Sequence, residues 1–138
     1  MIERRATVPG DAAQLSALTE FLRDFWSSAD LAPAQFTSFE LALEEVFTNI
    51  VMHGSQPGRV PQVEVSLVLA GDGLTMTVED DGPQFDPLSL PPPDITAGLE
   101  DRPVGGLGVF LIRQIMDAVS YQRIGTRNQL RITKHVTR

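Results

Sequence analysis

Two runs of alternating apolar and polar residues, joined by Gly71-Asp72-Gly73, constrain the fold of this chain most strongly. In residues 63–69 every second residue is valine or leucine, and a similar alternation returns in residues 74–80. A period of two places one side of each strand against a core. The glycines between the runs are typical of a tight hairpin turn. We therefore predict an antiparallel hairpin with one apolar face, which a second layer must cover.

Two helical segments can supply that layer. Apolar residues recur at helical spacing from Asp11, a candidate N-cap, as far as Ser28. A second helix is predicted to start at Pro33, because proline favours the first turn, and to end at His53. Gly54 is predicted to terminate this helix in the left-handed conformation, where glycine carries no steric cost.

The remaining pattern completes an α+β fold. Residues 2–8 are typical of a short strand, residues 105–117 of a helix, and residues 119–124 and 130–136 of two closing strands. Residues 81–104 have no period and contain three consecutive prolines, so we expect an irregular and functional loop there. The order β-α-α-β-β-loop-α-β-β predicts a two-layer sandwich, with a mainly antiparallel sheet and helices on one face.

Composition narrows the classes of function. The 138 residues predict one domain over 1–138. The chain has no cysteine, which excludes disulfides, a thiol nucleophile and cysteine-ligated zinc. Its net charge of −7, without a cluster of basic residues, predicts no direct binding to nucleic acid. Without a signal peptide or a membrane-length apolar stretch, we expect a cytoplasmic protein that does not insert into membranes.

A carboxylate and an amide share one face of the second predicted helix. Glu45 and Asn49 are four residues apart, and their neighbours are mostly apolar. A lone glutamate in such a place usually belongs to a solvated stripe. Because this helix has few polar positions, the pair is also compatible with a cleft, where it could bind a cation or activate a hydroxyl.

The end of the second hairpin strand carries a second candidate site. Asp80 is followed after one residue by Gly82, and such a pattern is most often an ordinary turn. The functional alternative is that Asp80 accepts a hydrogen bond from the amino group of a ligand. Gly82 would then allow the backbone to approach closely.

A glycine-rich segment opens the third predicted helix. It consists of Gly105, Gly106, Leu107 and Gly108. Free N–H groups and the positive end of the helix dipole at such a start suit a phosphate. The spacing matches neither the dinucleotide-binding fingerprint nor the P-loop.

Together the three segments resemble the nucleotide-binding boxes of the GHKL (Bergerat-fold) ATPases. Residues 40–54, with the pattern Glu-x-x-x-Asn-x-x-x-His, resemble the N box. Residues 78–87 and 105–117 resemble the first and second glycine boxes. The similarity extends from about Pro9 to Lys134 and is greatest to the bacterial anti-sigma-factor serine kinases.

The resemblance implies ATP and Mg²⁺ as ligands and assigns a role to each candidate residue. It makes Glu45 the general base for the target serine, Asn49 the Mg²⁺ ligand and Asp80 the reader of the adenine amino group. It places Gly82 beside the base, the segment Gly105, Gly106, Leu107 and Gly108 at the phosphates, and residues 88–104 in an ATP lid.

The implied function is that of an ATP-dependent serine/threonine protein kinase acting as an anti-sigma factor. Its substrate would be a serine of an anti-anti-sigma (STAS-type) protein, its other partner a sigma factor, and its assembly a homodimer. The alternative is a non-catalytic nucleotide-binding module that sequesters a partner. Two positions depart from the family pattern: Gln84 stands where a glycine is usual, and the threonine near adenine corresponds to either Thr126 or Asn128.

Overall fold

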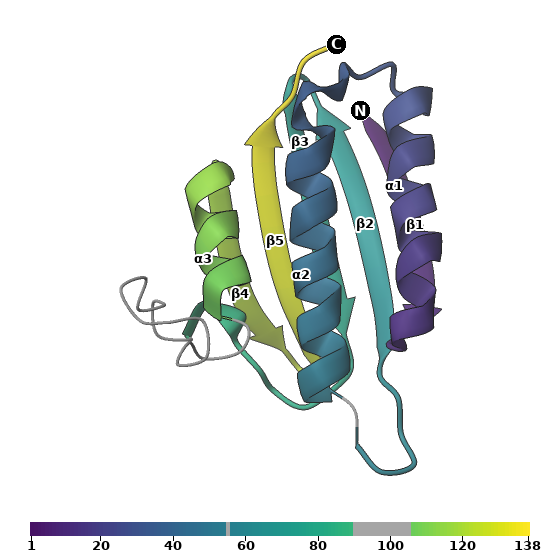
Figure 1. The fold of residues 1–138 in the computed structure, drawn as a ribbon, viewed down its shortest axis with the longest axis vertical. Coiled ribbons are helices and arrows are strands. Elements are labelled where there is room, and N and C mark those ends of the chain that lie inside the picture. The colour runs from purple at the N-terminus through teal and green to yellow at the C-terminus, as the bar shows by residue number, and fades with distance from the viewer. Residues whose placement is uncertain (55, 90–105) are drawn as a thin grey trace.

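The computed structural model describes residues 1–54, 56–89 and 106–138. In this part of the chain, helices cover one face of a five-stranded sheet (Figure 1). The strands are β1 (Ile2–Pro9), β2 (Gln62–Ala70), β3 (Gly73–Asp80), β4 (Ala118–Ile124) and β5 (Arg127–His135). The helices are α1 (Leu15–Ser28), α2 (Phe36–Gly54) and α3 (Gly106–Ile115), with short 3-10 turns at Ala12–Gln14, Pro33–Gln35 and Pro87–Ser89.

The sheet is antiparallel throughout and confirms the predicted α+β sandwich. Its strand order is β1-β2-β3-β5-β4, so the last strand of the chain lies between β3 and β4. This insertion pairs residues that are far apart in sequence. Asp80, the last residue of β3, lies directly opposite Asn128 near the start of β5.

The core confirms the predicted hairpin face. The alternating residues of β2 and β3 are buried under the helices, and the large side chains that meet them from α1 and α2 include Leu18, Leu22, Phe39 and Phe47. Trp26 closes the core where α1 ends, and its Nε1 donates a hydrogen bond of 2.8 Å to the Ala32 carbonyl. Among the described residues, no helix combines the length and apolar character needed to cross a bilayer.

The predicted left-handed end of the second helix is wrong. Gly54 is the last residue of α2, and its φ is not positive, unlike that of Gly71 in the hairpin turn. A Cβ on Gly54 would lie 3.1 Å from Cγ of Pro61, and the Gly54 Cα lies 3.4 Å from the position of a Cβ on Gly82. Close packing, rather than backbone conformation, therefore favours glycine here.

The C-terminus of α3 is held by the only lysine of the chain. Nζ of Lys134 donates a hydrogen bond of 2.7 Å to the Ile115 carbonyl, which belongs to the last turn of α3. A cation at this end also complements the helix dipole. We expect Lys134→Met to lower the free energy of unfolding by about 0.5–1.5 kcal/mol in urea denaturation. Arg131→Met, which removes an exposed charge from the same strand, is the control, and equal losses in both variants would contradict this role.

Candidate functional site

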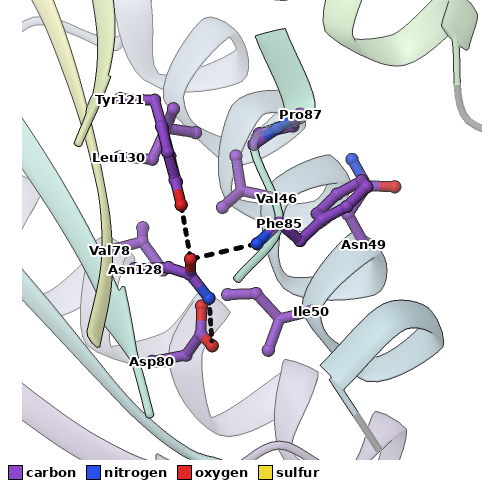
Figure 2. Close-up of a pocket in the computed structure, with 10 residues that line it drawn as sticks. All are labelled: Val46, Asn49, Ile50, Val78, Asp80, Phe85, Pro87, Tyr121, Asn128 and Leu130. Atoms are coloured by element: carbon purple, nitrogen blue, oxygen red, sulfur yellow. Dashed lines mark hydrogen bonds between the residues drawn. The ribbon is translucent and has the colours of Figure 1, made fainter. Parts of the chain in front are cut away.

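A pocket opens where the second half of α2 faces the end of β3 and the start of β5. Figure 2 shows the side chains around it, which converge from α2, the sheet and the segment that follows β3. Its cavity is small, with a volume of about 30 Å³ between these side chains. The lining residues are Val46, Asn49, Ile50, Val78, Asp80, Phe85, Pro87, Tyr121, Asn128 and Leu130.

Asp80 presents a fixed carboxylate to this pocket. Its side chain is 5% exposed, and Oδ1 accepts hydrogen bonds from Gly82 N at 2.9 Å and from Asn128 Nδ2 at 3.0 Å. Oδ2 accepts no hydrogen bond within the described part of the chain, so it can receive a donor from a ligand. A Cβ on Gly82 would lie 3.0 Å from Oδ1 of Asp80, which explains why glycine stands there.

Asn49 brings an unsatisfied amide to the same pocket. It is only 3% exposed, and its Nδ2 has no hydrogen-bond partner among the described residues. Leaving a buried amide unpaired costs about 1–3 kcal/mol, so native proteins rarely do so without a functional reason. Its oxygen is also a suitable ligand for a hard cation such as Mg²⁺. The unpaired Nδ2 therefore suits an acceptor atom of a ligand, whereas only the oxygen could bind a cation.

Glu45 lies one helical turn before Asn49 and contacts the start of α3 instead of lining the pocket. A Cβ built on Gly108 would overlap the Glu45 carboxyl group, so the glycine leaves room for the carboxyl in this position. Burial raises the pKa of Glu45, and the neighbouring Glu44 carboxylate raises it further. A carboxylate with a raised pKa is a better proton acceptor than an exposed one.

The shifted pKa of Glu45 predicts that this side chain destabilises the folded protein. The folded state binds its proton more tightly than the unfolded chain does, so ionised Glu45 reduces stability above the folded-state pKa. That penalty vanishes below the unfolded-state pKa, where both states are protonated. We expect Glu45→Gln to raise the thermal unfolding midpoint at pH 7.5, with a gain that shrinks toward pH 4. A variant that is less stable than the wild type at pH 7.5 would contradict this.

The structure groups the predicted site residues around the second half of α2, the end of β3 and the start of α3. Asp80 and Asn49 line one pocket, Gly82 is bonded to Asp80, and Glu45 meets Gly108 at the start of α3. Gly106 and Leu107 begin α3, just before this contact. Gly105 and most of the predicted lid, residues 90–104, lie outside the described residues.

The pocket also contains residues that the sequence patterns did not single out. Phe85 and Tyr121 line it, and the Phe85 ring stacks on His53 with 4.2 Å between centroids and 18° between planes. Of the two alternatives left open for the family threonine, Asn128 lines the pocket, whereas Thr126 is exposed in the β4–β5 turn. The pairing of β3 with β5 determines this choice.

Comparisons with known proteins agree with this arrangement. The chain matches the histidine kinase-like ATPase domain family over residues 8–134. It is 34% identical over 114 residues to the serine/threonine-protein kinase BtrW of Bordetella bronchiseptica, with 83% of this chain and 77% of BtrW covered. It is 30% identical over 97 residues to the serine-protein kinase RsbW of Listeria monocytogenes, with 67% and 62% covered.

A solved structure has a similar fold. A Mycobacterium tuberculosis chain containing RsbU and RsbW domains superposes with a TM-score of 0.72 at 14% sequence identity. The match covers all of the present chain but only 33% of that longer chain.

Proposed function

The chain belongs to the histidine kinase-like ATPase family, and from that premise we propose that it is an ATP-dependent serine/threonine protein kinase acting as an anti-sigma factor. One observation supports this function most strongly. Asn49 and Asp80, which have an amide nitrogen and a carboxylate oxygen without a partner among the described residues, line one pocket, and Glu45, whose pKa is raised, lies one helical turn before Asn49. The relatives named as serine kinases support the same reaction.

In this proposal each side chain has one task. Asp80 accepts a hydrogen bond from the adenine amino group through Oδ2, and the N–H groups that begin α3 at Gly106, Leu107 and Gly108 bind phosphate oxygens. Asn49 provides an amide oxygen for Mg²⁺, which neutralises phosphate charge when it is bound. The serine oxygen bonds to the γ-phosphorus as the bond to the ADP oxygen breaks. Glu45 takes the proton of the serine hydroxyl.

The partners follow from the same proposal. The phosphate acceptor is a serine of an anti-anti-sigma protein of the STAS type, and a sigma factor is the alternative partner. The kinase acts in the cytoplasm as a homodimer, with residues 1–138 forming one domain. No contact with nucleic acid is required.

Transfer of labelled phosphate tests the proposed function. The chain is incubated with γ-labelled ATP, Mg²⁺ and an anti-anti-sigma protein from the same organism. We expect a labelled serine on the partner, and no label on a variant of the partner in which that serine is alanine. Nucleotide binding without any transfer would contradict the kinase and favour a non-catalytic module that sequesters its partner. Gln84, which stands in place of the usual glycine, is exposed and is not among the residues that line the pocket.

A further inference from the structure

Asn128 connects the segment after β3 to the end of that strand. It is 5% exposed, and both hydrogens of its amide are used. Nδ2 donates to Oδ1 of Asp80 at 3.0 Å and to the Pro83 carbonyl at 2.8 Å. Neither acceptor can donate in return when Asp80 is ionised, so Nδ2 rather than Oδ1 must face them.

The oxygen of the same amide also has all the hydrogen-bond partners it can use. Oδ1 accepts hydrogen bonds from Phe85 N at 3.1 Å, from the Tyr121 hydroxyl at 2.6 Å and from Arg123 Nη1 at 3.2 Å. Figure 2 shows the Asp80, Phe85 and Tyr121 bonds meeting at Asn128. The backbone N–H and the guanidinium can only donate, which confirms the orientation of the amide.

Two neighbours stabilise this network from β4. Arg123 Nη1 also donates to the Gly82 carbonyl at 2.9 Å, so it ties the segment after β3 to the same amide. Burial raises the pKa of Tyr121, although the nearby Arg123 opposes the shift, and the hydroxyl therefore stays a donor. The contacts fix Asp80 and residues 82–85 as one unit.

Asn128 consequently has no donor left for the ring nitrogens of a base. Each amide hydrogen already has an acceptor, and a new bond to a ligand would leave Asp80 Oδ1 or the Pro83 carbonyl unpaired. Asp80 Oδ1 is occupied in turn by Gly82 N and Asn128 Nδ2, which leaves Oδ2 as its available acceptor. An acceptor held in one place favours a base that brings an amino group.

We propose that Asn128 is a positioning residue that gives this site its preference for a 6-aminopurine: it holds Asp80 as an acceptor and does not contact the base. The inference rests on the proposed binding of ATP. It concerns the selection of the base rather than the transfer of phosphate, so binding measurements alone can test it.

The test compares ATP with purine riboside triphosphate, which differs only by lacking the 6-amino group. Dissociation constants of both Mg²⁺ complexes are measured by calorimetry for the wild type and for Asn128→Ala. For the wild type we expect ATP to bind about tenfold or more tightly than the analogue, the usual cost of losing one hydrogen bond to a charged group. For Asn128→Ala we expect the ratio to approach one, mainly because ATP binds more weakly.

Two further variants separate positioning from general destabilisation. Gln129→Ala removes a hydrogen-bonded amide from the neighbouring position of β5, where it bonds to Glu79 on the other face of the sheet, and it should keep the wild-type ratio. Serine is too short to bridge Asp80 and Phe85, so Asn128→Ser should bind ATP and the analogue with nearly equal affinity. This variant provides the test if the alanine variant does not fold. Circular dichroism establishes which variants are folded.

The outcomes distinguish this inference from the proposed function. A folded Asn128 variant that keeps the wild-type ratio overturns the positioning role and leaves ATP binding intact. Equal weakening for both nucleotides also overturns it, because a purely structural role predicts that result. A wild type that binds neither nucleotide overturns the proposed function together with this inference.

Discussion

Replacing Glu45 by alanine should reduce phosphate transfer about 10²–10⁴-fold, the usual contribution of a general base. Binding of Mg-ATP should change little, because Glu45 does not line the pocket that contains Asp80 and Asn49. Its carboxyl group instead contacts Gly108 at the start of α3, where the proposed phosphate-binding N–H groups begin. Loss of transfer with binding retained is the signature of a group that acts on the acceptor hydroxyl.

Glu44 provides the matched control for this experiment. It is the adjacent residue with the same side chain, but it is exposed. Glu44→Ala should therefore transfer phosphate at nearly the wild-type rate, while single-turnover assays and calorimetry separate chemistry from binding in both variants. Transfer that survives in Glu45→Ala, or is lost equally in Glu44→Ala, would contradict the assignment of the base.

Adding one methyl group at Gly108 should have almost as large an effect. The Cβ of alanine would overlap the Glu45 carboxyl, which is the end of a flexible side chain and can turn away. The fold should tolerate this, since alanine in a helix is more favourable than glycine by about 0.5–1 kcal/mol. We expect Gly108→Ala to be at least as stable as the wild type and to transfer phosphate about 100-fold or more slowly.

A double-mutant cycle tests the physical cause of that loss. If the methyl group acts by displacing Glu45, it should have no further effect once the carboxyl is absent. The variant with both Glu45→Ala and Gly108→Ala should then be about as active as Glu45→Ala alone. Additive losses would show that Gly108 acts through another contact.

The sequence patterns were sufficient for the parts of the fold that depend on local spacing. The alternation in β2 and β3 and the helical stripes of α1 and α2 gave the layers of the sandwich correctly. The prediction for Gly54 is wrong because it relies on the common left-handed glycine at the end of a helix. Here Gly54 is fixed by Pro61 and Gly82, which approach it only in the folded chain.

In the candidate site, too, local patterns identify some residues, and others depend on how the strands pair. Spacing along one helix places Glu45 and Asn49 on the same face. The local pattern at the end of β3 leaves Asp80 between an ordinary turn and a ligand acceptor, and only the resemblance favours the second. Asn128 could not be chosen over Thr126, because the choice depends on the register of β3 and β5, in which Asn128 faces Asp80, 48 residues earlier in the sequence. That register also brings Tyr121 to the pocket from β4.

Titration of Mg-ATP into Asp80→Asn tests the central claim, that this pocket binds the nucleotide, most directly. The amide can keep the bonds to Gly82 N and Asn128 Nδ2 through its oxygen, but it then turns a donor toward the pocket. Asp81→Asn, which alters the adjacent carboxylate paired with Arg59, is the control. We predict saturable binding by the wild type and the control, and affinity weakened about 100-fold or more in Asp80→Asn. Equal affinity in all three proteins would contradict the claim.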